Sequence, residues 1–325
     1  MEKITIGSVT AARGEKKQGF LEVANRPDGT MISIPVMVAN GEEDGPTLLV
    51  NACAHGDEHE GSMSVITLFQ KLDPKKMKGT VIGVPVLHVD AAHGMRRGNF
   101  YDIYINDMNR IHPGNPDGFI TERISNIFFE EIVKKADYVM DLHSGANILY
   151  LAEQVYLVDP SSEDLAKAVG GPWNVIWQRK QGEVFGLGTS MAACSRLGIP
   201  AIVLEVGGTG GRYHFLEENI KKMVEGVTNV MRYLKIIDGK HEKADNYIDI
   251  NMVHLRCSHG GLAVPEESFA LRKWVEEGEK LIKIIDFFGN TVEEIKAPVK
   301  GYTVGRRVFP LIHPGEWVVF LGKPV

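Results

Sequence analysis

Residues 52–61 read ACAHGDEHEG and directly follow the apolar run TLLVN of residues 47–51. The run TLLVNAC (47–53) is typical of a buried strand, and GSMSVITLFQKL (61–72) repeats its apolar residues with the period of a helix. Five of the ten residues 52–61 are His, Asp or Glu, which the end of a buried strand does not need for packing. The stretch therefore predicts a strand–turn–helix unit whose turn carries a chemical site.

Strand-like and helix-like segments continue to alternate as far as residue 234. Strands are expected at residues 80–90, 137–143, 155–159, 174–178 and 201–208, and helices at 120–136, 163–169, 189–198 and 216–234. Because the expected strands are apolar throughout, both faces of their sheet should be covered. The pattern predicts the α/β class, with a mostly parallel sheet and helices on both faces. Such a sheet binds ligands at the carboxyl ends of its strands.

The two ends of the chain differ from this alternation. Residues 17–24 and 30–38 are strand-like runs joined by NRPDG, which predicts an antiparallel hairpin. Residues 236–247 are polar and predict a linker, and short β-rich runs separated by Gly and Pro follow it. We therefore expect a catalytic domain at residues 1–240, including the hairpin, and a β-rich accessory domain at residues 247–325.

The β-rich region resembles the barrel-sandwich folds of biotinyl and lipoyl carriers in the hairpin rhythm of IIDFFGNTVEEIKAPVKGYT (284–303). Carriers need a lysine at the tip of this hairpin, whereas the tip here is Gly289-Asn290. The region is therefore predicted to be a structural or gating lid rather than a swinging arm.

The composition argues against several classes of protein. Hydrophobic residues make up 44% of the 325 residues, and no run approaches the roughly 20 apolar residues of a membrane span. The formal charge of −6 comes from 36 Lys+Arg against 42 Asp+Glu without a long basic block, so a nucleic acid is a poor candidate partner. Three widely spaced cysteines and an amino terminus unlike a signal peptide predict a cytoplasmic location. A homo-oligomer is compatible with the β-rich region.

Two interpretations of HGDEH at residues 55–59 compete, and both are metal sites. In the first, His55 and Glu58 are ligands in an H-x-x-E pair that a distant histidine completes, with an open position for water. In the second, His55 and His59 bind the metal as helical i, i+4 neighbours and Glu58 is the base, as in the H-x-x-E-H motif of inverzincins. The preceding strand-like run and the poor helix propensity of Gly56 favour the first interpretation.

Two further chemical side chains fall at the ends of expected strands. DLHSG (141–145) places His143 there, and Asp141 or a nearby carbonyl can hold its second ring nitrogen and fix its tautomer. LEVGG (204–208) places Glu205 in an apolar run, where desolvation would raise the pKa of its carboxyl group toward that of a proton shuttle. Because such strand ends meet at one edge of a parallel sheet, these side chains are expected to converge with His55.

Four sequence blocks together carry a family resemblance. HGDE (55–58), MNRIHPG (108–114), DLHSG and LEVGG occur in the order and rough spacing of the succinylglutamate desuccinylase/aspartoacylase family, which is related to carboxypeptidase A, and the similarity spans residues 45–235. The appended β-rich region is similar to the branch that includes N-acetyl-diaminobutyrate deacetylases. The resemblance implies a zinc carboxypeptidase-like fold with one Zn²⁺ per subunit. It also implies the roles of individual residues: metal ligands His55, Glu58 and His143, general base Glu205, and substrate-carboxylate binding by Asn109 and Arg110.

These residue types also fit amide hydrolysis on chemical grounds. Zinc held by two neutral imidazoles and a carboxylate lowers the pKa of bound water toward about 7 and polarises an amide carbonyl. Glu205 would take the proton of the water and pass it to the leaving amine. Arg96 or Arg97 would stabilise the oxyanion, and Arg97 is our candidate for this role.

The predicted function is therefore zinc-dependent hydrolysis of the linear amide bond of a small N-acylated amino acid or a related amide. A metallocarboxypeptidase that acts on a peptide is the nearest alternative. A non-catalytic protein that binds zinc or a ligand is the alternative from a different class, and Glu205 argues against it because a binding module has no use for a base there.

The remaining candidate side chains are interpreted mainly as structural. Cys53 is expected to pack in the core, His59 to be exposed or to support the site, and the Gly207–Gly211 run to form a mobile loop rather than a phosphate cradle. The expected core or loop histidines are His88, His93 and His112, and candidates for substrate contact are Tyr213 and His214.

Overall fold

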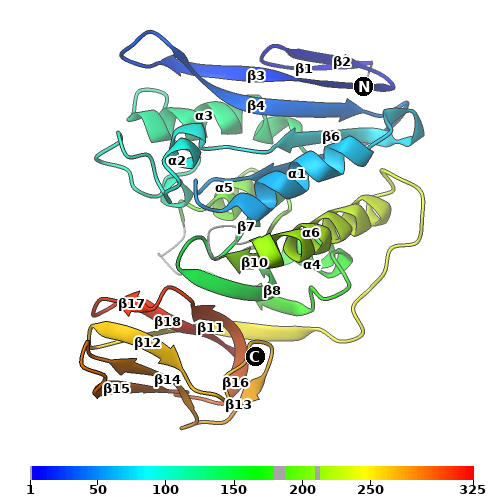
Figure 1. Ribbon diagram of the computed structural model, residues 1–325. Coiled ribbons are helices and arrows are strands. Elements are labelled where there is room, and N and C mark those ends of the chain that lie inside the picture. Colours follow the sequence, from blue (N-terminus) through cyan, green and yellow to red (C-terminus); the bar gives the residue numbers. More distant parts are fainter. Residues whose placement is uncertain (1, 179–186, 209–212) are drawn as a thin grey trace.

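The computed structural model describes residues 2–178, 187–208 and 213–325, in which strands alternate with helices as far as α6 (Tyr213–Tyr233) and strands alone follow it (Figure 1). The strands before α6 are β1 (Lys3–Ile6), β2 (Val9–Ala12), β3 (Glu15–Asn25), β4 (Met31–Asn40), β5 (Glu43–Ala52), β6 (Lys78–Val84), β7 (Tyr138–His143), β8 (Leu149–Leu157), β9 (Val175–Gln178) and β10 (Ala201–Gly208). The other helices are α1 (His59–Lys71), α2 (Val89–His93), α3 (Ile120–Glu131), α4 (Glu163–Ala168) and α5 (Ser190–Arg196). The strands after α6 are β11 (Ile248–Arg256), β12 (Gly261–Pro265), β13 (Trp274–Val275), β14 (Lys280–Ile285), β15 (Thr291–Lys296), β16 (Gly301–Arg307), β17 (Leu311–Ile312) and β18 (Trp317–Pro324).

A twelve-stranded sheet of order β13-β16-β18-β11-β9-β8-β10-β7-β5-β6-β4-β3 runs through the molecule. Parallel pairing joins β6, β5, β7 and β10, and separately β8, β9 and β11, whereas the other pairs are antiparallel. The α/β class is confirmed, but the sheet is mixed rather than mostly parallel. An apolar run reports that a strand is buried on both faces, and it carries no information on the direction of its neighbours.

Helices cover both faces of the central strands, as predicted. Leu48 and Val50 of β5 belong to a core that includes residues of α1, α4 and α6, whereas Leu49 between them belongs to a core that includes residues of α3 and α5. Successive strand residues point to opposite faces, so this alternation requires a cover on each side. No helix within the described ranges has both the length and the apolar character needed to cross a bilayer.

The expected elements are largely present, with differences at their ends. The predicted N-terminal hairpin is confirmed as the antiparallel pair β3–β4. The strand expected at residues 80–90 ends at Val84, before Pro85, and residues 89–93 form α2 instead. Proline cannot donate to a sheet ladder, which accounts for the early end. β8 begins at Leu149, several residues before the predicted strand.

The C-terminal region, residues 248–325, is all-β as expected, and it extends the main sheet. β11 pairs with β9, and β16 pairs with both β18 and β8, so that β16, β18, β11, β9 and β8 close into a five-stranded ring. A second sheet of order β15-β14-β12-β17, drawn in yellow to red at the lower end of Figure 1, packs over a separate apolar core. The boundary between domains at residues 240–247 stays a prediction.

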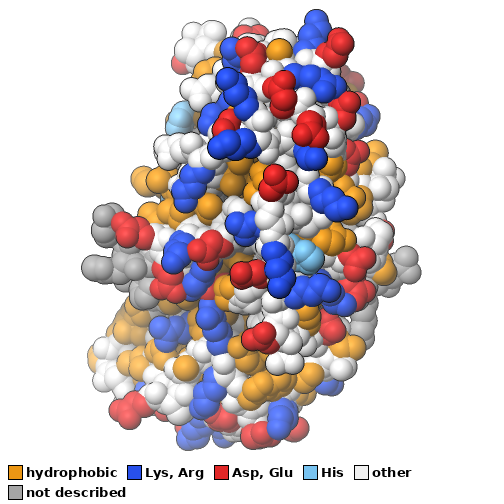
Figure 2. Space-filling model, turned by 90° about the vertical axis from the view of Figure 1, so that its right-hand side faces the viewer, with side chains coloured by type: hydrophobic (Ala, Val, Ile, Leu, Met, Phe, Trp, Pro, Cys, Tyr) orange, Lys and Arg blue, Asp and Glu red, His pale blue; other side chains and the backbone are white. Residues whose placement is uncertain are grey.

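The surface carries both signs of charge. On the face shown in Figure 2, Lys and Arg side chains are interspersed with Asp and Glu side chains rather than gathered in a basic stripe. The exclusion of nucleic acid as a partner stays a prediction.

His88 gives the fold a predicted sensitivity to acid. Its side chain is fully buried, and burial lowers the pKa of His88 to about 4 from the ordinary 6.5. Above pH 6.5 the residue is neutral in both states, whereas between pH 6.5 and 4 only the unfolded chain binds the proton, so stability falls as the pH falls. We expect the free energy of unfolding of His88→Leu to fall by about 3 kcal/mol less than that of the wild type between pH 7 and pH 4. Denaturant unfolding of both proteins at a series of pH values measures this difference. A variant with the wild-type pH slope would contradict the prediction.

Candidate metal and active site

Three neighbouring parallel strands bring the predicted side chains to one edge of the sheet. β5, β7 and β10 lie side by side and run in the same direction, and Glu205 is paired directly with His143. β5 ends at Ala52, so His55 follows its carboxyl end. His55, His143 and Glu205 all line one cavity, as the strand-end argument predicted.

The turn after β5 places Glu58 beside His55. The Glu58 N–H donates to the His55 carbonyl oxygen at 3.2 Å, and α1 begins only at His59. Only glycine fits at position 56, because a Cβ atom there would lie 2.0 Å from the carbonyl carbon of Ala91. His55 and His59 therefore do not share a helix, and the geometry supports the H-x-x-E interpretation over the inverzincin motif.

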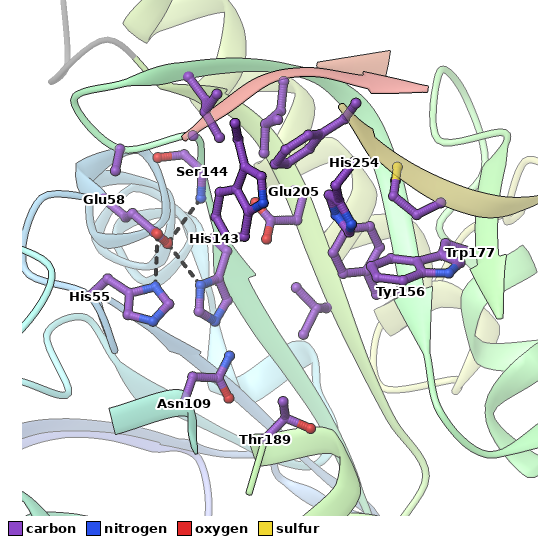
Figure 3. Close-up of a pocket in the computed structure, with 18 of the residues that line it drawn as sticks. His55, Glu58, Asn109, His143, Ser144, Tyr156, Trp177, Thr189, Glu205 and His254 are labelled. Atoms are coloured by element: carbon purple, nitrogen blue, oxygen red, sulfur yellow. Dashed lines mark hydrogen bonds and ion pairs between the residues drawn. The ribbon is translucent and has the colours of Figure 1, made fainter. Parts of the chain in front are cut away.

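His55, Glu58 and His143 form a buried cluster of potential metal ligands (Figure 3). Glu58 Oε1 lies 2.8 Å from His55 Nδ1, and Glu58 Oε2 lies 2.8 Å from His143 Nδ1. One ligand atom from each residue lies within 4.8 Å of the other two, a combination found nowhere else in the described part of the chain. Although burial opposes ionisation, the two imidazoles hold the pKa of Glu58 well below its usual range.

Two carboxylates approach the other ring nitrogens of these histidines. Asp107 Oδ1 lies 3.0 Å from His55 Nε2, and Asp141 Oδ2 lies 3.2 Å from His143 Nε2, at ion-pair distance without hydrogen-bond alignment. They favour the orientation in which both Nδ1 atoms face Glu58. Asp141 was a predicted partner of His143. Asp107 was missed, although its position two residues before Asn109 in DMNR is a sequence signal.

Glu205 faces the same cavity from β10 (Figure 3). Its Oε2 atom is buried and has no hydrogen-bond partner among the described residues. Burial raises the pKa of Glu205 to about 8, with the nearby Glu58 adding to the shift and His143 opposing it. The expected desolvated carboxyl group is therefore present, with a pKa near neutrality.

Of the two candidate arginines, Arg97 reaches the cavity. It donates to Asp107 Oδ2 from Nε at 3.1 Å and from Nη2 at 2.9 Å, and its Nη1 atom lies 3.7 Å from Glu58 Oε1. Arg96 instead stacks on Phe100, with the guanidinium carbon 4.9 Å from the ring centroid. The placement agrees with our choice of Arg97.

The MNR segment also lines the cavity. Asn109 Oδ1 accepts a hydrogen bond from the Ser190 N–H at 2.9 Å, and Figure 3 shows the amide nitrogen of Asn109 turned toward the histidines. Arg110 donates to the Asn109 carbonyl oxygen at 2.7 Å and lies 3.6 Å from Asp107 Oδ2. Both predicted substrate-binding residues therefore lie within the site.

Aromatic rings from the middle of the chain and from its C-terminal region form one wall of this cavity, whose volume is about 680 Å³. Tyr156 and Trp177 are 4.5 Å apart between ring centroids, and His254 and Phe320 are also 4.5 Å apart. The rings that line the cavity are Tyr156, Trp177, His254, Trp317 and Phe320, of which the last three belong to the C-terminal region. Sequence reasoning missed this wall because its members are isolated aromatic residues spread over β8, β9, β11 and β18.

Of the residues interpreted as structural, those that the structure describes lie outside the cavity. Burial raises the pKa of the Cys53 thiol to about 12, and its Sγ atom donates to the His55 carbonyl oxygen, which fits core packing. His88 and His112 are buried in the core, and His59 is the first residue of α1. Residues 209–211 and the side chains of Tyr213 and His214 lie outside the described part of the chain.

A sequence model of the succinylglutamate desuccinylase/aspartoacylase catalytic domain matches residues 44–234. The chain belongs to the succinylglutamate desuccinylase/aspartoacylase family. The match covers nearly the same residues as the resemblance carried by the four sequence blocks, and it contains the buried His–Glu–His cluster and Glu205.

Individual proteins of known name are also similar to this chain in sequence or fold. N-alpha-acetyl-L-2,4-diaminobutyric acid deacetylase of Halomonas elongata is 28% identical over an alignment of 326 positions, which covers 95% of this chain and 92% of that protein. The product-bound ectoine utilization protein of Ruegeria pomeroyi aligns with a TM-score of 0.85 at 24% identity, covering 97% of both chains. A succinylglutamate desuccinylase of Silicibacter sp. TM1040 aligns with a TM-score of 0.82 at 24% identity, covering 95% of both chains. The fold is thus shared over the C-terminal region as well as the catalytic domain.

Proposed function

We propose that this protein is a zinc-dependent deacylase that hydrolyses the amide bond of a small N-acylated amino acid. The observation that supports it most strongly is the buried His55–Glu58–His143 cluster, which shares one cavity with the desolvated Glu205. A metal site beside a carboxyl group with a pKa near neutrality provides the two functions that amide hydrolysis requires, electrophilic activation and proton transfer.

The donor set fits Zn²⁺. Two imidazole nitrogens and one carboxylate are a ligand set of catalytic zinc sites, and all three side chains line the cavity, as an ion with an open coordination position requires. Such an ion, held by His55, Glu58 and His143, supplies positive charge that lowers the pKa of a water molecule and polarises an amide carbonyl. The relation of the fold to zinc carboxypeptidases stays a prediction.

Glu205 is the proton carrier in this proposal. Its buried Oε2 atom has no partner among the described residues, so it can accept a proton from the attacking water. It then delivers this proton to the amide nitrogen as the C–N bond breaks, so that the acyl group leaves as an acid and the amino acid as a free amine. The positive charge of a bound Zn²⁺ would lower the pKa of Glu205 from about 8 toward neutrality, where the carboxylate can take the proton and the carboxylic acid can deliver it.

Three donors beside the cluster hold the substrate. Arg97 lines the cavity beside Glu58 and would stabilise the oxyanion, because its guanidinium group is already oriented by Asp107. Asn109 and Arg110 would hold the carboxylate of the amino acid, for which a guanidinium fork and an amide N–H are suitable donors.

The substrate class follows from the family and from the relative in Halomonas elongata, whose name gives N-alpha-acetyl-L-2,4-diaminobutyric acid as its substrate. We place N-acetylated amino acids, including diamino acids, first among the candidates. The test is a panel of N-acetyl, N-succinyl and N-formyl amino acids with zinc-loaded protein, read as release of free amine. A chelator should abolish the release and added zinc should restore it. Amine release that continues after complete removal of the metal would contradict the proposal.

Peptide hydrolysis is the second candidate, and a larger set of substrates separates the two. Release of carboxy-terminal residues from peptides, with N-acyl amino acids left intact, would favour a carboxypeptidase. Bound zinc without turnover on any amide would favour a binding protein. A cytoplasmic location and a homo-oligomer stay predictions.

Arg97→Ala is expected to lower kcat by about 10²-fold, because one preoriented oxyanion donor is lost. Arg96→Ala is the matched control and should leave kcat within about twofold, since Arg96 stacks on Phe100 instead of lining the cavity. Steady-state kinetics with zinc content measured in parallel decides the result. Equal losses in the two variants would contradict the role of Arg97.

A further inference from the structure

Glu60 is a buried carboxylate of the HGDEHEG stretch that neither the metal cluster nor the proposed reaction uses. It is the second residue of α1 and is 1% exposed. Its Oε2 atom accepts a hydrogen bond from the Ser144 hydroxyl at 2.8 Å, and its Oε1 atom accepts one from the Gly208 N–H at 2.8 Å. One side chain thus connects α1 with the ends of β7 and β10.

Each of these three segments carries one of the residues that the proposed reaction needs. Glu58 directly precedes α1, and His143 is the last residue of β7, next to Ser144. The Ser144 N–H also donates to Glu58 Oε2 at 3.2 Å, which extends the connection to the metal cluster. Glu205 lies on β10, three residues before Gly208.

The ladder between β10 and β8 is interrupted at the point where Glu60 holds β10. Glu205 pairs with Gln154 and Gly207 pairs with Leu151, so β8 has one more residue than β10 between these two pairs. Because ladder hydrogen bonds are lost at such an irregularity, other contacts must hold this end of β10. A Cβ atom at Gly207 would lie 2.8 Å from Glu60 Oε1 and 2.2 Å from Asn219 Nδ2, so this backbone lies directly against the carboxylate.

We propose that Glu60 is a positioning residue that fixes Glu205 relative to the metal ligands by joining the ends of β7 and β10 to α1. The predicted effect on kcat rests on the proposed function, whereas the predicted support of the end of β10 by Glu60 does not. A displacement of about 1 Å in a reacting group can lower the rate by about 10²-fold. The hydrogen bonds of Glu60 to Ser144 and Gly208 should therefore affect kcat even though Glu60 does not face the substrate.

The test compares three variants at a temperature well below each measured Tm. Glu60→Leu fills a similar volume but accepts no hydrogen bond, whereas Glu60→Gln keeps an acceptor for Gly208 and a polar group for Ser144. Glu153→Leu is the matched control for the loss of a buried carboxylate at the same strand pair, because Glu153 lies on β8 opposite this part of β10 but its side chain pairs with Lys222 and Arg272 and lines a different cavity. Two readouts are collected: kcat and KM at full zinc loading, and amide hydrogen exchange at Ser144 and Gly208.

For Glu60→Leu we expect kcat to fall about 10–100-fold with KM within about threefold, zinc content unchanged, and faster exchange at Gly208. Glu60→Gln should recover most of the activity, and Glu153→Leu should keep the wild-type kcat. Wild-type kcat or unchanged Gly208 exchange in Glu60→Leu would overturn the proposal. If the wild-type protein itself released no amine, the proposed function would fail, while Gly208 exchange would still decide whether Glu60 fixes this strand end.

Discussion

Glu205→Gln should lower kcat by roughly 10²–10⁴-fold while the protein keeps its zinc, because the amide group that replaces the carboxylate cannot accept a proton. The substitution preserves size and leaves His55, Glu58 and His143 in place. Burial of an amide in this position should also be tolerated, since the native carboxyl group already lies in a desolvated site with a pKa of about 8. Single-turnover and steady-state rates on the best N-acyl amino acid, with zinc measured on the same samples, give the result.

A matched control separates proton transfer from general damage to the fold. Glu153→Gln also neutralises a buried glutamate of the sheet, but one that lines a different cavity. It should leave kcat within about threefold, since it contacts none of the reacting groups. A Glu205→Gln variant that kept more than a tenth of the wild-type kcat would mean that another group carries the proton.

Glu58→Ala should abolish stoichiometric zinc binding and, with it, turnover. The carboxylate is the bridge between the two imidazoles, and its removal leaves His55 and His143 without the anionic ligand of the proposed set. Asp107→Asn removes no metal ligand but does remove the charge that supports His55 and orients Arg97, so its zinc affinity should fall by roughly 10–100-fold and by less than that of Glu58→Ala. Competition with a chromogenic zinc chelator measures both affinities.

The ordering of these two variants is the informative outcome. If Glu58→Ala bound zinc as tightly as the wild type, the His55–Glu58–His143 assignment would be wrong. Thermal denaturation of the metal-free proteins serves as the control, because a folded Glu58→Ala variant that fails to bind zinc cannot be explained by unfolding.

Local sequence identified most of the chemistry because each motif sits beside a strong secondary-structure signal. The apolar run before His55 and the apolar run through Glu205 predicted strands, and a polar side chain at such a position has few structural uses. The resemblance based on four short blocks then named a family that the match over residues 44–234 confirms. The roles of the individual site residues stay proposals for the experiments above.

What the sequence left open has a common physical origin in contacts between distant segments. It named Arg97 as the candidate but held no local reason to prefer it to Arg96, because which of two adjacent side chains turns inward depends on Asp107, ten residues from Arg97. The prediction of a mostly parallel sheet was wrong, because the hydrophobicity of a strand reports its burial and not the direction of its neighbours. Neither the antiparallel pairing of β8 with β10 nor the joining of β11 to β9 has a local signal.

The sequence by itself determined the alternation of strands and helices, the burial of the central strands on both faces, and the presence of metal-ligand residues at strand ends, since all three follow from hydrophobic periodicity and residue type. Only the tertiary structure decided that Glu60 ties two strand ends to α1 and that C-terminal rings such as Trp317 complete the cavity. These contacts join residues more than 80 positions apart, and such pairings are set by how whole strands pack rather than by any local pattern.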